Sequence, residues 1–486
     1  MAHVTNLIGF EEFSQTIPQF MLESLLRFRK ADALGHKVKD AWEHFSYTEV
    51  IEKIKNVALG LQDLGVNAGD RVAIISENRP EWSFADIAIL SLRGVNVPIY
   101  TTQAVEQIRY ILEDSGAKAL FISGKKLWKH ALQALEGVEQ LEKIIFFEED
   151  ALPENDSRVI SFAQLEAKGE ELNKIDERAY ARLLAEIKTE DLATIIYTSG
   201  TTGEPKGVML THENFTSNVL AISKGLPILP TDRSLSVLPL SHIFERVCFY
   251  VMALNGVSVH YCAAFDQLAP GLQEVKPTVM TAVPRLFEQV YHKIVKKGMS
   301  AGGLKTKLFS WALEIGQQYW DYKEKRQAVP ATLAAKHAIA DKLVFTKWRA
   351  GVGGELRFFV SGGAPLSKKL SYAFWSAGIP ILQGYGMTEG CVVTANRPDD
   401  KHIASIGTLF EGIEMKVAED GELLVRGKNV MRGYFNKPEV TAEVLKDGWY
   451  HTGDIGYQGD DGHFYITDRK KDLFKLSNGK YIAPLQ

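Results

Sequence analysis

The chain has 486 residues, of which 45% are hydrophobic, so it can bury a large core and is long enough for roughly two to four domain-sized units. A net charge of -4 gives no electrostatic reason to expect a nucleic-acid partner, because proteins of that class usually present a basic face. The three cysteines, Cys248, Cys262 and Cys391, form no C-x-x-C pair, which argues against a zinc site and a disulfide framework and favours a reducing cytosol.

The N-terminal stretch MAHVTNLIGFEEFSQ contains acidic residues and no long apolar run, so it does not resemble a secretory signal. No other stretch reaches the ~18 consecutive apolar residues that a membrane-spanning helix needs. We therefore expect a soluble, cytoplasmic protein, and the sequence leaves peripheral contact with a membrane open.

Up to about residue 400, short apolar runs alternate with longer helical patterns, which predicts a largely parallel α/β architecture. RVAIIS at 71–76 and KALFIS at 118–123 have the composition of buried strands. The segment IRYILEDSG between them has a helical pattern that ends before a glycine. This order of strand, helix and strand is typical of a parallel sheet.

The stretch YTSGTTGEPKG at 197–207 combines glycines, hydroxyls and the single lysine Lys206. Glycines let a backbone approach a ligand closely, while hydroxyls, backbone N–H groups and a lysine can all donate to phosphate oxygens. Its spacing is not G-x-x-x-x-G-K-[ST], and no such match occurs elsewhere in the chain, so a P-loop NTPase has no support. Taken alone, the stretch favours a phosphate site only modestly over an ordinary polar surface loop.

Two amphipathic helices are predicted next. PRLFEQVYHKIVKKG begins at Pro284, repeats apolar residues at helical spacing and stops at Gly298. KTKLFSWALEIGQQYWDYKEKR follows it and has a stripe of large side chains along one side, which we interpret as packing rather than as a ligand site. The stripe consists of Leu308, Trp311, Ala312, Ile315, Tyr319 and Tyr322.

Four later stretches have chemistry that suits ATP. FFVSGGAPLS at 358–367 ends in a glycine turn that could lie against a planar ring, and ILQGYGMTEG at 381–390 offers a tyrosine face, a hydroxyl and a carboxylate able to hold Mg²⁺. WYHTGDIG at 449–456 offers a carboxylate for ribose hydroxyls, and DRKKDLFKLSNGKYIAP at 468–484 offers an arginine fork and several lysines. Each stretch alone is more often structural, but five of them in one chain favour a nucleotide site.

After residue 400 the pattern changes to short alternating runs with Gly and Asp-Gly turns, as in ASIGTLFEGIEMKVAEDGELLVRGKNV and DDGHFYITD. This pattern predicts a small antiparallel β unit that is appended to the α/β body.

In order and composition, YTSGTTGEPKG, LPLSHIFERV, SGGAPL, QGYGMTEG, YHTGD and DRKKDLFKLSNGKYIAP resemble the motif series of the adenylate-forming (AMP-binding) superfamily. That superfamily includes acyl-CoA synthetases, luciferases and peptide-synthetase adenylation domains. LPLSHIFER and the final motif resemble long-chain fatty acyl-CoA synthetases most closely. The resemblance covers nearly the whole chain.

The resemblance implies two α/β subdomains with mainly parallel sheets and a small antiparallel β-barrel-like subdomain, mainly about 402–467. It implies a large N-terminal domain over 1–467 and a hinge over 468–486. Its family members continue for roughly another hundred residues, a domain-sized length. We therefore expect this chain to lack the mobile C-terminal domain, which carries a catalytic lysine. Such a chain would bind ATP and the acid but would be impaired in catalysis.

The resemblance also implies a role for each matching site residue. The predicted roles are a phosphate loop at Thr198, Ser199, Gly200, Thr201, Thr202, Gly203 and Lys206; adenine contacts at Gly363, Ala364, Gln383, Gly384 and Tyr385; the adenylate-phosphate contact at Thr388; the Mg²⁺ ligand at Glu389; ribose contacts at Asp454 and Arg469; and a histidine beside the reacting carboxylate at His242. Lys206, His242, Thr388 and Glu389 form the predicted catalytic set. Lys475 is close enough in its motif to help with phosphate charge, and Arg246 is expected to be structural.

The implied reaction joins a long-chain fatty acid to coenzyme A in two steps, with ATP as co-substrate and Mg²⁺ as cofactor. Since the attacking thiol comes from coenzyme A, none of the three cysteines has to be catalytic, and Cys391 is expected to be a small packed residue. Two alternatives stay open. One is a ligase for another carboxylic acid, such as a medium-chain, aryl or amino acid, or a ligase that transfers the acyl group to a carrier protein. The other is a non-catalytic protein that binds ATP or an acyl group.

Overall fold

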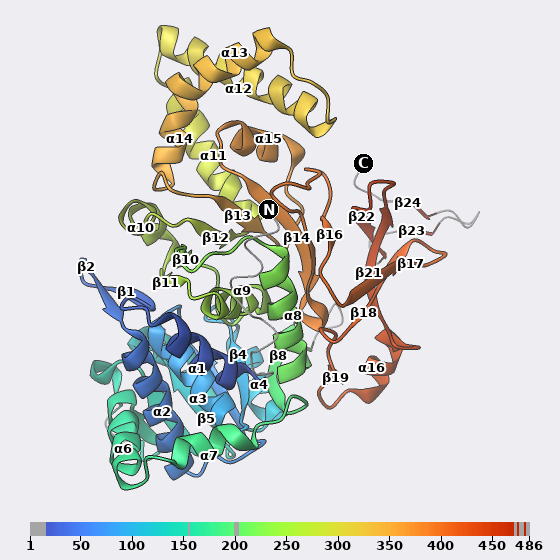
Figure 1. The fold of residues 1–486 in the computed structure, drawn as a ribbon. Helices are drawn as coiled ribbons and strands as arrows, with labels where there is room; N and C mark the ends of the chain where they lie inside the picture. Colours follow the sequence, from blue (N-terminus) through green and yellow to red (C-terminus); the bar gives the residue numbers. More distant parts are fainter. Residues whose placement is uncertain (1–15, 154–155, 199–203, 471–473, 476–480, 483–486) are drawn as a thin grey trace.

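A computed structural model describes residues 16–486 except 154–155, 199–203, 471–473, 476–480 and 483–486. Figure 1 shows three regions in chain order. A blue and cyan region holds most of the largest sheet, a green to orange region holds most strands of two smaller sheets and a projecting group of helices, and a red region holds an antiparallel sheet. Among the described helices, none combines the length and the apolar composition that crossing a membrane requires.

The largest sheet has eight strands in the order β19-β9-β8-β4-β3-β5-β6-β7. Strands β3 to β8 pair in parallel, and β9 and β19 join antiparallel at one edge. The bounds are β3 Arg71–Ile75, β4 Val95–Ile99, β5 Ala117–Ile122, β6 Lys143–Phe146, β7 Val159–Ser161, β8 Leu192–Thr198, β9 Lys206–Thr211 and β19 Gly433–Tyr434. The predicted strands at 71–76 and 118–123 are confirmed.

Helices cover both faces of this sheet, which explains why its strands are almost continuously apolar. Val72 and Ile74 belong to a core that includes α2, α3 and α6, while Ala73 and Ile75 belong to a core that includes α4 and α5. The helices are α1 Ile17–Phe28, α2 Tyr47–Asp63, α3 Pro80–Ser91, α4 Val105–Ser115, α5 Lys125–Leu135, α6 Phe162–Ile175 and α7 Ala179–Glu186. As predicted, α4 ends before a glycine, and Gly116 has a φ of 62°.

Two further sheets form the middle of the molecule, with strand orders β10-β11-β1-β2 and β12-β13-β14-β15-β16. Strands β12, β13 and β14 pair in parallel, and β15 and β16 are antiparallel. The bounds are β1 Leu34–Val38, β2 Ala41–Phe45, β10 Arg233–Ser236, β11 Ser258–Tyr261, β12 Val279–Ala282, β13 Phe358–Ser361, β14 Ile381–Met387, β15 Cys391–Ala395 and β16 Thr408–Leu409. Their parallel strands agree with the predicted α/β class.

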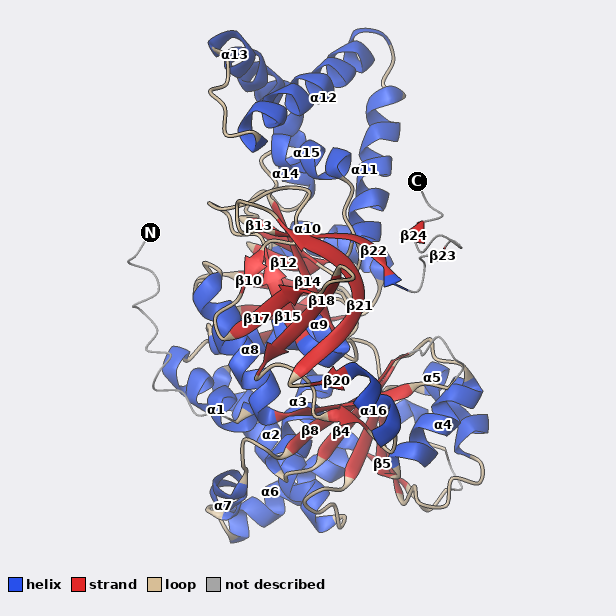
Figure 2. Cartoon of the chain, turned by 90° about the vertical axis from the view of Figure 1, so that its right-hand side faces the viewer, coloured by secondary structure: helices blue, strands red, loops and turns tan. Residues whose placement is uncertain are grey.

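Figures 1 and 2 show a group of helices that projects from this middle region. The helices of the region are α8 His212–Gly225, α9 Ile243–Leu254, α10 Leu268–Val275, α11 Pro284–Met299, α12 Gly303–Glu324, α13 Ala331–Ala340, a π-helix at Asp341–Phe345, α14 Thr346–Gly351 and α15 Lys368–Ser376. Helix α11 begins at Pro284 as predicted and ends one residue beyond the predicted Gly298. The stripe on α12 is only partly buried, because Ala312 and Ile315 lie in the core while Trp311, Tyr319 and Tyr322 are half-buried.

The predicted antiparallel unit forms a sheet with the order β17-β18-β21-β20, and β22 pairs with the other end of β21. Figure 2 shows the long, curved strand β21 across the front of the molecule. The bounds are β17 Ile413–Val417, β18 Glu422–Gly427, α16 Pro438–Val444, β20 Leu445–Lys446, β21 Trp449–Gln458 and β22 Phe464–Arg469. Beyond it, β23 Phe474–Lys475 pairs with β24 Tyr481–Ile482.

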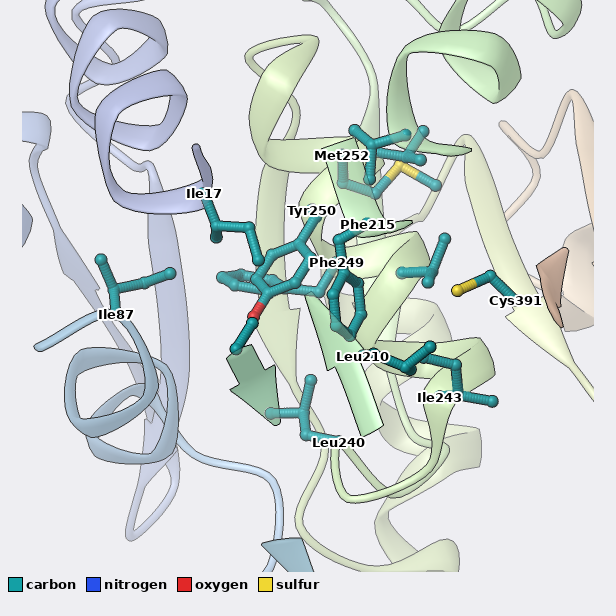
Figure 3. Packing of buried hydrophobic residues seen from close by; sticks show 14 of the residues in the cluster. Ile17, Ile87, Leu210, Phe215, Leu240, Ile243, Phe249, Tyr250, Met252 and Cys391 are labelled. Atoms are coloured by element: carbon teal, nitrogen blue, oxygen red, sulfur yellow. The ribbon is translucent and has the colours of Figure 1, made fainter. Parts of the chain in front are cut away.

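A fully buried ion pair connects the large sheet to the middle region. Arg246 of α9 lies 2.5 Å from Asp86 of α3, and both side chains are 0% exposed. The hydroxyl of Tyr250 donates to Asp86, and Arg246 donates to Tyr250 and to Thr194 of β8. Figure 3 shows Tyr250 against Phe215 in the surrounding core, with ring centroids 5.5 Å apart. The structure thus gives Arg246 the contacts of a structural residue.

Removing one member of this pair should strongly destabilise the fold. Arg246→Met leaves Asp86 as a buried charge without its counter-ion, which is expected to cost about 3–5 kcal/mol of unfolding free energy. Unfolding by heat and by urea, followed by fluorescence, measures the loss.

Two control variants make this prediction specific. Arg182→Ala removes an exposed ion pair with Asp176 and should cost less than about 1 kcal/mol. The double variant Asp86→Leu with Arg246→Met removes both charges and should recover much of the stability that the single variant loses. A double variant no more stable than Arg246→Met would contradict this account.

Candidate nucleotide and acyl site

The stretch YTSGTTGEPKG connects β8 to β9. Thr198 and Lys206 face each other in the antiparallel register at the end of this hairpin, with the Thr198 hydroxyl 3.5 Å from the Lys206 carbonyl oxygen. The intervening predicted phosphate contacts, Ser199 to Gly203, lie outside the described residues. The structure therefore describes the two ends of the predicted phosphate loop.

The stretch QGYGMTEG folds as the end of β14 and a turn of 3₁₀-helix at 388–390. Gly386 lies so close to β15 that a Cβ atom there would be 2.0 Å from the Cys391 carbonyl oxygen, so no other residue fits. The turn is held from the C-terminal side, because the Met431 amide donates to the Glu389 carbonyl at 2.7 Å. Thr388 and Glu389 are half-buried on this turn.

Tyr434 joins two of the predicted site residues, and the sequence analysis missed it. Its hydroxyl donates to Glu389 Oε1 at 2.8 Å, and the Lys206 ammonium lies 5.2 Å from its ring centroid. Burial and the nearby Glu389 carboxylate raise the pKa of Tyr434, so it stays a neutral donor. Lys206 therefore lies over the ring whose hydroxyl binds Glu389.

A second group of predicted residues converges on Asp454. Tyr385 donates its hydroxyl to Asp454 Oδ2 at 2.7 Å, and Arg469 Nε lies 3.0 Å from Asp454 Oδ1. Asp454 and Arg469 are register partners in β21 and β22. The Asp454 side chain is only 6% exposed, whereas that of Arg469 is 72% exposed. Each carboxylate oxygen has a second acceptor position, which leaves capacity for ribose hydroxyls.

Tyr450 of β21 is close enough to both groups to interact electrostatically with them. Burial, the Glu389 carboxylate and the phenols of Tyr434 and Tyr385 all raise its pKa. Together with the short segment from Tyr385 to Glu389, Tyr450 places the group around Asp454 beside the group around Glu389.

A cavity of about 570 Å³ is lined by three more of the predicted residues. His242, Gly363 and Ala364 line it, together with apolar side chains that include Phe244 and Val283. His242 caps α9 by accepting a hydrogen bond from the Phe244 amide at its Nδ1, and burial lowers its pKa. Gly363 has a φ of 81°, a conformation that favours glycine. Since β13 pairs with β14 as far as Ser361 and Gln383, the glycine turn after β13 lies beside the Gln383–Tyr385 segment.

Three other predicted residues lie outside these groups. Gln383 is buried, and its side-chain oxygen has no hydrogen-bond partner among the described residues, so it is free to accept from a ligand. Gly384 pairs with Ala395 in the sheet. The backbone of Lys475 lies in β23, and its side chain lies outside the description.

The cysteines show no sign of catalytic activation. Cys391 is 1% exposed, and burial raises its pKa to about 12, which opposes the thiolate form. Burial also raises the pKa values of Cys248 and Cys262. These observations agree with the interpretation of Cys391 as a packed residue.

The family model described as AMP-binding enzyme matches residues 24–435. A long-chain-fatty-acid–CoA ligase, FadD15, from Mycobacterium bovis is 37% identical over 450 residues, which are 92% of this chain and 73% of the relative. The peroxisomal long chain acyl-CoA synthetase 7 from Arabidopsis thaliana is 34% identical over 463 residues, or 90% of this chain and 63% of that protein.

Solved structures share the fold. An anthranilate CoA ligase, AuaEII, in complex with anthranoyl-AMP has a TM-score of 0.76 and 21% identity, covering 97% of this chain and 81% of its own. The N-terminal domain of FACL13 from Mycobacterium tuberculosis has a TM-score of 0.70 and 23% identity, covering 93% of this chain and 99% of its own. These likenesses confirm the predicted α/β fold class.

Glu245, three residues after His242, should make stability depend on pH. It is buried, accepts from Ser236 and Thr281, and burial raises its pKa from 4.5 to about 7. Between these values the unfolded chain releases this proton while the folded chain keeps it, so stability falls as pH rises. Glutamine is neutral at every pH, so the Glu245→Gln protein should not show this loss. Above neutral pH the loss amounts to up to about 3 kcal/mol of unfolding free energy in the parent.

The measurement is the melting temperature of both proteins across that pH range. The Glu245→Gln protein should gain on the parent as pH rises, since both keep a neutral side chain at the acidic end. Parallel curves for the two proteins would contradict the raised pKa.

Proposed function

This chain belongs to the AMP-binding enzyme family, among relatives named long-chain-fatty-acid–CoA ligases, and from that premise we propose that it activates a long-chain fatty acid with ATP and transfers the acyl group to coenzyme A. One observation carries the proposal. Gly363 and Ala364, from the predicted adenine segment, line the same apolar cavity as His242. A nucleotide bound along that segment would therefore meet an apolar acid bound in the cavity.

The first step overcomes the poor leaving group of a carboxylate, which would otherwise have to expel oxide. A carboxylate oxygen attacks the α-phosphorus of ATP, an acyl C–O–P bond forms, and the bond to pyrophosphate breaks. Negative charge builds on the phosphate oxygens during this step. Lys206 and the Thr388 hydroxyl are the groups that we assign to this charge, and neutral His242 would orient the acid.

Magnesium fits the residues present. Glu389 is a half-buried carboxylate on a fixed turn, and Tyr434 occupies only its Oε1 among the described contacts. One protein carboxylate together with substrate phosphates is a common arrangement for this ion. Bound there, it would neutralise phosphate charge, and Tyr434 would hold the carboxylate in position.

Asp454, Tyr385 and Arg469 would bind the nucleoside end. The buried Asp454 would accept from ribose hydroxyls while Tyr385 fixes its orientation. In the second step, the thiol of coenzyme A attacks the acyl carbon, a thioester bond forms, and AMP leaves with the former carboxylate oxygen. This proposal assigns residues 1–467 to the substrate-binding body and 468–486 to a hinge.

The space available agrees with a long acyl chain. A second cavity of about 490 Å³ lies among α10, α11, α12 and α14, and its apolar lining includes Leu272, Ile294 and Phe309. Both cavities share Phe265, Leu286 and Gln289 in their linings, so they adjoin. An acid whose carboxylate lies near His242 could extend its tail into the second cavity.

The proposed nucleotide site is tested by binding. A non-hydrolysable hexadecanoyl-adenylate mimic should bind the parent chain in calorimetry, and Asp454→Ala should weaken it by roughly 10- to 150-fold, since hydrogen bonds to a charged group contribute about 1.5–3 kcal/mol. Asp447→Asn, on the exposed turn before β21, should bind as the parent does. No binding by the parent, or equal binding by Asp454→Ala, would overturn the assignment.

The choice of acid is tested by chain length. Octanoyl-, dodecanoyl- and hexadecanoyl-adenylate mimics should bind with increasing affinity, by at most about fourfold for each additional buried methylene at ~0.8 kcal/mol. Gln289→Trp at the junction should weaken the hexadecanoyl mimic and leave the octanoyl mimic unchanged.

A matched control for Gln289→Trp is Glu288→Trp. It adds the same side chain at the preceding residue of α11, which lines neither cavity. Equal affinity for all three mimics, or preference for an aryl mimic, would favour a ligase for another acid. Fatty-acid-dependent exchange between ATP and pyrophosphate reports on the first chemical step in the same proteins.

A further inference from the structure

A cluster of metal-ligand side chains lies away from the proposed active site, where the loop after β15 meets the turn between β21 and β22. His402 comes from the loop, and Asp461 and His463 come from the turn. One potential ligand atom from each residue lies within 4.8 Å of the others. His402 Nε2 is 3.2 Å from Asp461 Oδ2, and His463 Nδ1 is 3.6 Å from Asp461 Oδ1.

His463 has no evident role without a ligand. Its side chain is 0% exposed, and neither ring nitrogen has a hydrogen-bond partner among the described residues. A buried imidazole normally has both nitrogens satisfied, because an unpaired buried polar atom is unfavourable. Its position is fixed through the backbone, since the His463 amide donates to Asp461 and its carbonyl accepts from Gly459.

We propose that His402, Asp461 and His463 bind a divalent transition-metal ion, with Zn²⁺ as the best match. Two imidazoles and a carboxylate are typical zinc ligands, whereas Mg²⁺ and Ca²⁺ prefer oxygen ligands alone. Bond lengths of about 2.0–2.1 Å place the ligand atoms of a tetrahedral site about 3.3 Å apart. The separations of 3.2 and 3.6 Å come close to that value, and because they involve different oxygens of Asp461, the carboxylate would face the ion with both oxygens.

Asp400 supports the site from its outer side. Its Oδ1 lies 3.9 Å from His463 Nε2 and accepts from Arg326 at 3.0 Å. Arg326 Nη2 also lies 3.4 Å from His402 Nε2. Arg326 therefore pairs with Asp400, and an ion that binds His402 Nε2 must displace the guanidinium from that nitrogen. A water can complete the coordination, while Asp400 stays beside the other nitrogen of His463.

The ion would connect two segments that are otherwise linked by a short pair of backbone hydrogen bonds. The Ile406 amide donates to the Phe464 carbonyl, and the Phe464 amide donates to the Gly407 carbonyl. Asp461 and His463 precede β22, the strand that carries Arg469. The ion would thus fix the β21–β22 hairpin against the middle region, and its role would be structural.

Titration of the chelator-treated protein with Co²⁺ tests the proposal. One Co²⁺ per chain should bind with visible absorption bands, Zn²⁺ should displace it, and both ions should raise the melting temperature. His402→Gln and Asp461→Asn, whose side chains are not fully buried, should each weaken Co²⁺ binding by at least about tenfold. Circular dichroism checks that both variants are folded.

The chain offers a matched control in its other histidine pair, since His44 and His260 have their Nε2 atoms 3.2 Å apart. His44→Gln should bind Co²⁺ as the parent does. Absence of stoichiometric binding, parental affinity in both His402→Gln and Asp461→Asn, or loss of binding only in His44→Gln would each overturn the proposed site.

Discussion

The buried pair of Asp86 and Arg246 is the constraint on which the candidate site depends. It fixes α9 against α3 of the large sheet, and Arg246 also donates to Thr194 on β8, the strand that ends at Thr198. The same helix begins next to His242 in the proposed acyl cavity. One hydrogen-bonded network therefore sets the distance between the predicted phosphate hairpin and the predicted acid pocket. An apolar contact could supply similar stability, but it would not fix the helix in orientation so specifically.

The site collects at the carboxyl ends of strands that come from different sheets. β8, β13 and β14 all run toward it, and each ends in a segment with glycine. This placement is the usual one for ligand sites in parallel α/β sheets. Edge strand β19 of the largest sheet then adds Tyr434, which reaches Glu389, and the antiparallel unit adds Asp454, which reaches Tyr385. No single sheet holds the complete set of groups.

The sequence predicted elements whose signal is local and missed contacts that pairing decides. Strands β3 and β5 and helix α11 follow from apolar runs and a proline start. Tyr434 could not be found in this way, because its position depends on β19 pairing with β9 across more than two hundred residues. Periodicity identified the stripe on α12 but missed Phe309, the buried aromatic residue of that helix. It missed Phe309 because α12 packs against neighbours on more than one side. Cysteine spacing argued against a zinc site, yet that argument concerns thiolate ligands and does not bear on His402 and His463.

The contacts around Asp454 divide the nucleotide site into a fixed part and an adaptable part. The Tyr385–Asp454 hydrogen bond is partly buried and is made by a carboxylate that is only 6% exposed, so it holds the carboxylate in one orientation before any ligand arrives. The Arg469–Asp454 ion pair involves a side chain that is 72% exposed, and such pairs contribute little to stability, typically below about 1 kcal/mol. Arg469 can therefore leave Asp454 at small cost and turn toward an incoming nucleotide. Preorganisation of the proposed ribose contact would rest on Tyr385, whereas Arg469 would supply a charge that is free to move.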